Sequence, residues 1–248
     1  MVLSELKQVI DPTTTESGWK GLCKLGGITA LIVVVVTLAE IVIGFLPGVA
    51  RLTQGTVTVI DWFTLLQNHW FLGLRNLGLL NIIGAALLAP TFLAIYSALR
   101  RDSEAYGAFG TVLFFVGMAV YIASNRAFAM LSLSGQYASA TADAQRSLLN
   151  AAGQAMLAEG QTRAGIPLIE FASLVISVVM LRGKVFSKAT AYAGILGNAL
   201  LLVFEAILAF VPAFLNVGLV IAGGGGLAIM IWYLLVGRRL LRLSVSGR

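Results

Sequence analysis

Five ionisable residues lie inside long apolar stretches of the sequence: Glu40, Arg75, Arg126, Glu170 and Glu205. A charge at the centre of a membrane helix costs at least about 2.5 to 3.5 kcal/mol, so such side chains usually face the protein interior and pair with one another or line a polar pathway. A carboxylate in that setting can bind a cation, take up a proton or serve as an acid or base. These residues therefore indicate a polar site within the apolar part of the chain.

Other polar residues recur at helical spacing beside the carboxylates. Asn198 stands seven residues before Glu205, which places both on one side of a helix. The same spacing groups Thr29 and Thr37 with Glu40, and Ser173 and Ser177 with Glu170. We expect these polar sides to face inward. All five charged residues are predicted in the outer third of the membrane, roughly 6 to 11 Å from the outer ends of their helices, so they can form one layer.

The predicted layer contains two arginines and three glutamates, so one carboxylate lacks a cationic partner unless it is protonated or binds a ligand. One interpretation is an outward-opening polar pocket. The other is a network of salt bridges and hydrogen bonds that only fixes the register of the helices. The candidate ligand-binding residues are Glu40, Arg75, Arg126, Glu170, Asn198 and Glu205. Among the carboxylates, Glu205 is the first candidate for a titrating or ligand-binding group and Glu40 the second.

The elements that position these residues follow from composition. Of the 248 residues, 58% are hydrophobic and 11% are charged, whereas soluble domains carry about 25% charged residues. Six apolar stretches are long enough to cross a bilayer: Leu22 to Leu46, Phe71 to Leu99, Tyr106 to Leu133, Ile166 to Leu181, Phe186 to Val211, and Phe214 to Leu235. The prediction is an all-α polytopic membrane protein, a six-transmembrane-helix bundle with an outer-face amphipathic helix.

Basic residues predict the orientation of this bundle, because cytoplasmic segments of membrane proteins are enriched in lysine and arginine. One side collects Lys7, Lys20, Lys24, Arg100, Arg101, Arg182, Lys184, Lys188, Arg238, Arg239, Arg242 and Arg248. The other side has Arg51, Arg146 and Arg163. Both termini are therefore predicted to be cytoplasmic, in the plasma (inner) membrane. The net charge of +6 is a topology signal rather than a sign of a nucleic-acid partner.

The predicted organisation has a cytoplasmic segment over residues 1–21, a single transmembrane domain over 22–237 and a basic cytoplasmic tail over 238–248. Outer loops occupy residues 47–70 and 134–165. The Arg238-Arg239 pair is interpreted as a stop-transfer anchor rather than as a site for an anionic partner. The lipid bilayer is the expected partner, together with a small polar ligand from the outer side.

Each outer loop is predicted to contain a helix. In the first loop, Trp62, Leu66 and Trp70 recur at helical spacing, which is typical of a short helix lying in the membrane interface. In the second, between Gln136 and Arg163, the predicted features are a Thr141 N-cap, Asp143 in the first turn, an apolar face of Leu148, Leu149, Ala152 and Met156, and a stop at Gly160. This second helix either forms a lid over the outer end or rests on the membrane surface.

Four consecutive glycines, Gly223, Gly224, Gly225 and Gly226, lie near the middle of the sixth predicted helix. Small residues allow membrane helices to approach closely, so tight packing is one interpretation, within the chain or against a protein partner or second copy. A locally unwound segment or a groove for an apolar ligand is the other. Pro90 and Pro167 fit a kink and a first-turn position respectively.

Several chemistries are excluded by counts of residues. Cys23 is the single cysteine and His69 the single histidine, so one chain offers neither an internal disulfide nor a two-histidine haem or three-histidine zinc site. His69 is interpreted as a solvated interfacial residue, with a ligand role as the alternative. Lysine occurs in the predicted spans only near their ends, at Lys24 and Lys188, so none is placed for a Schiff base within the membrane, and we find no phosphate loop or nucleophile elbow. We predict no cofactor, no metal site and no catalytic residue.

Part of the sequence resembles a known family. The similar stretches are Asn81-Ile82-Ile83-Gly84 through Leu99-Arg100-Arg101, Ala123-Ser124-Asn125-Arg126-Ala127-Phe128-Ala129-Met130-Leu131, Tyr137-Ala138-Ser139-Ala140-Thr141, and Leu149-Asn150-Ala151-Ala152-Gly153-Gln154. They resemble the bacterial domain-of-unknown-function family 4386, whose members are six-helix membrane proteins. The resemblance covers most of the chain after about Leu72. It implies the six-helix architecture and no assigned chemistry.

Three functions are compatible with this sequence. The first is a small protein that binds or moves a polar or cationic solute, or a proton, from the outer side. The second is an accessory or structural membrane subunit whose charged layer only stabilises the bundle. The third is an intramembrane enzyme that uses Glu40, Glu170 or Glu205 as an acid or base, although a nucleophile or metal set for it is missing.

Overall fold

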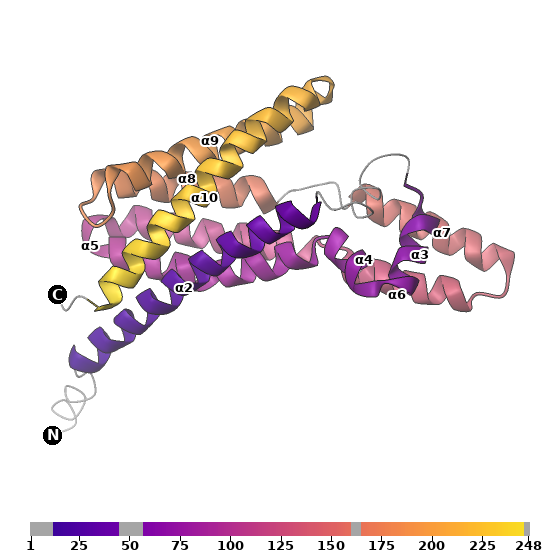
Figure 1. Ribbon diagram of the computed structural model, residues 1–248, viewed down its shortest axis with the longest axis horizontal. Coiled ribbons are helices and arrows are strands. Elements are labelled where there is room, and N and C mark those ends of the chain that lie inside the picture. Colours follow the sequence, from indigo (N-terminus) through magenta and orange to yellow (C-terminus); the bar gives the residue numbers. More distant parts are fainter. Residues whose placement is uncertain (1–11, 45–56, 160–164, 246–248) are drawn as a thin grey trace. The chain divides into compact units, whose positions relative to one another are not determined.

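The computed structural model describes residues 12–44, 57–159 and 165–245, and helix is the only regular secondary structure in these ranges (Figure 1). The α-helices are α2 (Pro12–Gly44), α3 (Val59–Asn68), α4 (Trp70–Asn76), α5 (Leu79–Ala123), α6 (Ala127–Ser139), α7 (Asp143–Glu159), α8 (Gly165–Arg182), α9 (Lys188–Phe210) and α10 (Leu215–Val245). A single 3-10 turn, η3 (Pro212–Phe214), connects α9 with α10.

Within these ranges, five segments are long and apolar enough to cross a membrane: Gly18–Ile43, Leu79–Ser139, Gly165–Arg182, Lys188–Phe210 and Pro212–Val245. This composition supports a membrane protein. The predicted first, fourth, fifth and sixth spans correspond to α2, α8, α9 and α10. The end of the first, at Leu46, lies outside the described residues, as do Lys7, Arg51, Gly160, Arg163 and Arg248.

The second and third predicted spans are wrong in their continuity. The second is interrupted at Leu77 and Gly78, between α4 and α5, and Gly78 there has a φ of 93°. The third is interrupted between Ala123 and Ala127, where α5 ends and α6 begins. Asn125 connects the two breaks, since its Nδ2 donates to the Leu77 carbonyl at 3.1 Å and its Oδ1 accepts from the Ala127 N–H at 2.9 Å.

The long element α5 consists of two helices that fold back on each other. Ser103 has non-helical angles (φ −161°, ψ 84°) and marks the turn between them. Phe92 and Phe114, one on each arm, stack with ring centroids 3.5 Å apart, whereas in one straight helix they would be separated by about 33 Å. This fold-back agrees with the separation of the second and third spans that the sequence predicts.

The chain divides into two compact units. The first comprises the described residues within Met1–Val34, Leu87–Phe115 and Pro167–Arg248, and the second those within Val35–Ala86 and Val116–Ile166. In the second unit, α3, α4, α6 and α7 enclose an apolar core of Val59, Phe63, Leu66, Leu74, Ala127, Met130, Leu133, Ala140 and Leu149. Two side-chain bonds join α3 to α6, from Gln67 Nε2 to the Ser134 carbonyl and from Ser134 Oγ to the Phe63 carbonyl.

Both predicted loop helices exist, but their buried faces differ from the prediction. In α3 the face directed at the core carries Phe63 and Leu66, so Leu66 does not face the membrane interface, and Trp70 begins the next helix. In α7, Leu149 is buried while Leu148 is 70% exposed. The helix starts at Asp143, so Ala142 and not Thr141 directly precedes it. Which of two adjacent residues is buried depends on the position of the partner helix, and helical periodicity alone does not predict that position.

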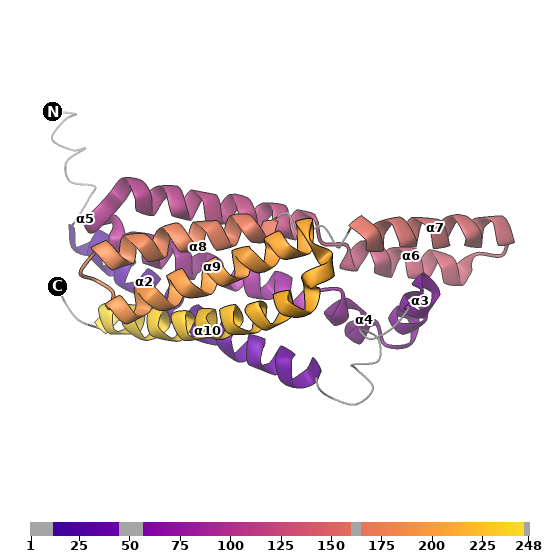
Figure 2. The ribbon, with the colours of Figure 1, turned by 90° about the horizontal axis from the view of Figure 1, so that it is seen from above.

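The first unit is built around close helix contacts at glycines. A Cβ on Gly194 of α9 would overlap Ser177 Oγ of α8 and lie 2.6 Å from Trp232 Nε1 of α10. A Cβ on Gly225 of α10 would lie 3.0 Å from Leu201 Cγ and 3.2 Å from the Gly197 carbonyl of α9. The four consecutive glycines lie within the helix α10. Of these four, Gly225 is the one in tight contact with α9. Figure 2 shows α8, α9 and α10 side by side.

Several of the predicted cytoplasmic segments meet at one end of the first unit, which we call the basic end. Arg100, before the fold-back of α5, lies 4.4 Å from the ring centroid of Trp19 in α2. Asp102 accepts the backbone N–H of Lys184 at 3.1 Å, and Arg239 Nε donates to the Val185 carbonyl at 2.6 Å. Because α10 continues to Val245, the predicted tail from Arg238 is helical as far as that residue.

Candidate functional site

Glu40 and Arg75 form an ion pair in the second unit. Arg75 Nη2 lies 2.8 Å from Glu40 Oε2 and also donates to the Glu40 carbonyl at 3.3 Å, while Nη1 donates to Asn76 Oδ1 at 2.9 Å. The Arg75 side chain is 8% exposed and the Glu40 side chain is 26% exposed. Arg75 therefore lies within salt-bridging reach of Glu40.

The break between α4 and α5 positions this arginine. Arg75 lies in the last turn of the seven-residue α4, and the left-handed Gly78 ends that helix by turning the chain into α5. Arg75 thus belongs to a helix junction rather than to the interior of a continuous span, which corrects its predicted setting. A junction exposes backbone groups that an arginine and an asparagine can satisfy, so these polar residues suit the position.

Arg126 occupies the second junction, directly before α6. Its backbone carbonyl accepts the Met130 N–H at 2.9 Å, and the residue is half-buried. Asn125, its neighbour, makes the two bonds that hold the junction together. Arg126 is therefore also at a helix boundary, rather than seven residues inside a span as predicted.

The polar side of α8 is buried as predicted. Glu170, Ser173 and Ser177 are 6%, 2% and 0% exposed. The two serines donate to carbonyls one turn earlier, Ser173 to Ile169 at 2.8 Å and Ser177 to Ser173 at 2.7 Å. These bonds satisfy the hydroxyl groups within their own helix, as serines in membrane helices commonly do.

The polar side of α9 is buried as well. Asn198 is 3% exposed and donates through Nδ2 to the Gly194 carbonyl at 2.7 Å, and Glu205 is 8% exposed. Gly194 itself is in contact with Ser177 and Trp232. Asn198 therefore lies one turn from a close contact of α9 with both α8 and α10.

The register of α8 against α9 relates the two buried carboxylates. A short connection makes these helices antiparallel, and the Ser177–Gly194 contact then sets Ser173 level with Asn198 and Glu170 level with Leu201. Four residues separate Leu201 from Glu205, which corresponds to about 6 Å along the helix axis. Glu170 and Glu205 are thus about one turn apart on two packed polar faces of one unit.

Comparison with known proteins gives no match. No family model, no curated protein and no solved structure matches the chain. The resemblance to family 4386 accordingly stays a prediction, and the site has to be interpreted from its own geometry.

The candidate residues fall into two groups according to the two units. Glu40, Arg75 and Arg126 belong to the second unit, while Glu170, Asn198 and Glu205 belong to the first. A single layer that contains all of them stays a prediction.

Sequence reasoning missed Trp232, a fully buried tryptophan whose Nε1 has no hydrogen-bond partner among the described residues. Its spacing from Gly225, seven residues, could have placed it on the packed face of α10.

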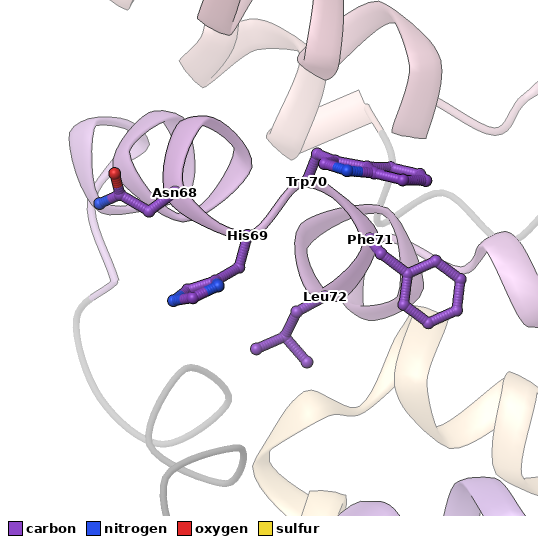
Figure 3. A pocket seen from close by; sticks show the side chains of 5 residues that line it. All are labelled: Asn68, His69, Trp70, Phe71 and Leu72. Atoms are coloured by element: carbon purple, nitrogen blue, oxygen red, sulfur yellow. The ribbon is translucent and has the colours of Figure 1, made fainter.

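His69 lies at the break between α3 and α4 and is exposed. It lines a pocket of about 420 Å³ with Asn68, Trp70, Phe71 and Leu72 (Figure 3). All five residues are consecutive, so the hollow follows from the turn of one segment and not from the convergence of several elements. Among the described residues, no group of three or more histidine, cysteine or acidic side chains is placed to bind a metal.

Proposed function

We propose that this chain is a multi-pass membrane protein that binds a proton or a small cationic solute at Glu170 and Glu205. The observation that carries the proposal is the burial of both carboxyl groups on the packed polar faces of α8 and α9. Ionisable groups at such depth in apolar helices are costly, and they are typically found where an ion, a proton or a polar substrate is handled. Asn198 and the two α8 serines are buried on the same polar faces.

The ion pair gives Glu40 a structural role. Glu40 already has Arg75 at 2.8 Å, so its charge is balanced within the protein. Its role in the proposal is to connect α2 with α4. Glu170 and Glu205 are assigned to ligand binding because both are buried on the packed polar faces of α8 and α9, each five residues from one end of its helix.

We also propose six membrane crossings, with the basic end in the cytoplasm. The fold-back at Ser103 supports two crossings within Leu79–Ser139, and together with the other four segments this gives six. The concentration of basic residues at the turns of the first unit supports the orientation. An impermeant maleimide added outside cells should label Ala151→Cys but not Arg101→Cys in a Cys23→Ser background. The reverse labelling would contradict this orientation.

The binding proposal is tested in liposomes that contain the purified protein and an enclosed pH-sensitive dye. A pH gradient should drive proton entry, and a second series should follow uptake of radiolabelled methylammonium. Glu205→Gln and Glu170→Gln each keep the shape of the side chain while removing its charge. We expect at least about a tenfold loss of the rate in one of these two series, because the charge of the binding carboxylate is removed.

Glu104→Gln is the matched control, because Glu104 is an exposed carboxylate at the fold-back of α5. It should retain the rates of the unmodified protein. Rates equal to those of protein-free liposomes, or rates unchanged in both buried variants, would refute the proposal.

A structural subunit is the second candidate, and the Glu40–Arg75 ion pair favours it. In that case the buried polar groups hold the helices in register and bind nothing. Glu170→Gln and Glu205→Gln would then change the unfolding free energy of the protein without changing any flux. The same two variants therefore distinguish the two functions.

A further inference from the structure

A cavity of about 430 Å³ lies at the basic end of the first unit. The connection between α8 and α9, the first turn of α9 and the last turns of α10 form it. Its polar lining consists of Lys184, Ser187, Thr190, Arg238, Arg239 and Arg242. Val185, Phe186 and Leu235 complete the wall with apolar surface. We call this cavity the basic pocket; it is separate from the buried carboxylates of the proposed function.

The charge of the basic pocket has one sign. Four of its nine lining residues are lysine or arginine, and none of the nine is acidic. Arg238 and Arg242 are four residues apart on α10 and so share one side of the helix, an arrangement of like charges that disfavours the helix. Asp102, outside the lining, accepts the Lys184 backbone N–H through Oδ2 at 3.1 Å. This lining suits an anionic ligand.

The local structure already orients several of the donors. Arg239 Nε donates to the Val185 carbonyl at 2.6 Å, and this bond does not use the two Nη groups of the guanidinium. Ser187 caps α9, its Oγ accepting the Thr190 N–H at 3.2 Å and lying 2.9 Å from Thr190 Oγ1. The N-terminus of the 23-residue α9 adds the positive end of a helix dipole. Paired guanidinium groups beside hydroxyl groups are well suited to a phosphate.

The position of the pocket identifies the source of the phosphate. It lies at the ends of two segments that are apolar enough to cross a membrane, Lys188–Phe210 and Pro212–Val245. That level corresponds to lipid headgroups, and its apolar wall is suited to the adjacent glycerol and upper acyl chain. We propose that the basic pocket binds the phosphate-bearing headgroup of an anionic phospholipid, as basic pockets between membrane helices do elsewhere.

The test uses the full-length protein in a neutral detergent, with binding followed by the rise in melting temperature. The titrants are dihexanoyl phosphatidylglycerol, dihexanoyl phosphatidylcholine and sn-glycerol 3-phosphate. The pocket variant is Arg238→Gln/Arg242→Gln. The matched control is Lys24→Gln/Arg101→Gln, which removes two exposed charges from α2 and from the fold-back of α5, outside the pocket lining.

Phosphatidylglycerol should bind the unmodified protein and the control variant with similar affinity, and the pocket variant about tenfold or more weakly. Phosphatidylcholine and glycerol 3-phosphate should bind at least about tenfold more weakly than phosphatidylglycerol. Equal losses of phosphatidylglycerol affinity in the pocket and control variants would overturn the proposal, because binding would then depend on the overall charge and not on the pocket. Glycerol 3-phosphate binding as tightly as the lipid would overturn the lipid assignment in favour of a soluble phosphate.

Lys184→Gln serves as a second variant in case changes in α10 impair folding. Lys184 is exposed in the connection between α8 and α9, where its side chain can be shortened without altering a helix. It should weaken phosphatidylglycerol binding about threefold to fivefold, the contribution of one basic residue. Unchanged affinity in this variant would also contradict the proposal.

Discussion

The four consecutive glycines of α10 differ in what a methyl group would contact. A Cβ on Gly223 or Gly226 has no atom within 4 Å, whereas on Gly225 it would lie 3.0 and 3.1 Å from Leu201 Cγ and Cδ2 and 3.2 Å from the Gly197 carbonyl. The carbonyl belongs to a helix backbone and cannot rotate away as a side chain would. Replacing these glycines one at a time by alanine therefore separates helix propensity from packing at nearly the same place.

The expected magnitudes follow from two terms. Alanine is preferred over glycine in a helix interior by roughly 0.5 to 1 kcal/mol, so Gly223→Ala and Gly226→Ala should raise the free energy of unfolding by about that amount. Gly225→Ala has the same propensity gain but overpacks the contact with α9, which costs about 1 to 3 kcal/mol. Because propensity cancels between Gly223→Ala and Gly225→Ala, their difference of about 1 to 3 kcal/mol measures the packing at Gly225 alone.

The assay is reversible unfolding in mixed detergent micelles, followed by tryptophan fluorescence and circular dichroism. If Gly225→Ala is as stable as Gly223→Ala, the close approach of α10 to α9 is not present and the reasoning fails. The same variants address the predicted self-association. A dimer that uses the exposed glycines would weaken in Gly223→Ala although the chain itself becomes more stable, and crosslinking in membranes would detect it.

Three further predictions concern the second unit. Arg75→Met should lower the unfolding free energy by about 1 to 3 kcal/mol, because it leaves the Glu40 carboxylate largely buried without its cation. In a double-mutant cycle, Arg75→Met/Glu40→Gln should recover most of that loss. A double variant as unstable as Arg75→Met alone would contradict a stabilising ion pair. Gly78→Ala should cost about 1 to 2 kcal/mol in a thermal melt because φ is 93°, whereas the helical Gly84→Ala should not. At the start of α3, hydrogen bonds from the side chain and backbone of Thr58 hold the pKa of Asp61 below its ordinary value of 3.8. The ionised Asp61 should therefore stabilise the folded state above about pH 4, and this stabilisation should be lost as the pH falls through the lowered pKa. Hydrogen exchange of the α3 amides should report this loss, and Asp61→Asn should abolish its acid dependence. Identical pH profiles of exchange in Asp61→Asn and the unmodified protein would contradict this prediction.

The sequence predicts the segments whose apolar runs are uninterrupted. The predicted spans at Ile166 to Leu181 and Phe186 to Val211 differ from α8 and α9 by one or two residues at each end. Helical period also predicts the buried side of α8, where Glu170, Ser173 and Ser177 are all buried. These successes share a cause, since both length and facing are local properties of one helix.

The breaks beside Arg75 and Arg126 escape this reasoning because they depend on a contact between distant residues. Asn125 donates to a carbonyl 48 residues away in the sequence, at Leu77. Hydropathy averaged over a span counts Leu77 and Gly78 as apolar and small, and gives no sign that the helix stops there. The signal that could have indicated the second break is the polar run Ser124-Asn125-Arg126 within an apolar stretch.

The packing of the first unit bears on the side from which a ligand would reach the buried carboxylates. Gly194, Gly197 and Gly225 bring α9 against its neighbours at successive levels, and their contacts leave no space for an added methyl group. Along α9, these levels lie between the basic end and Glu205. Phe210, at the far end of α9, is 84% exposed, and Glu205 lies about one and a half turns before it. For the proposed function, we therefore expect a proton or cation to reach Glu205 from the end of α9 opposite the basic end rather than past the packed glycines.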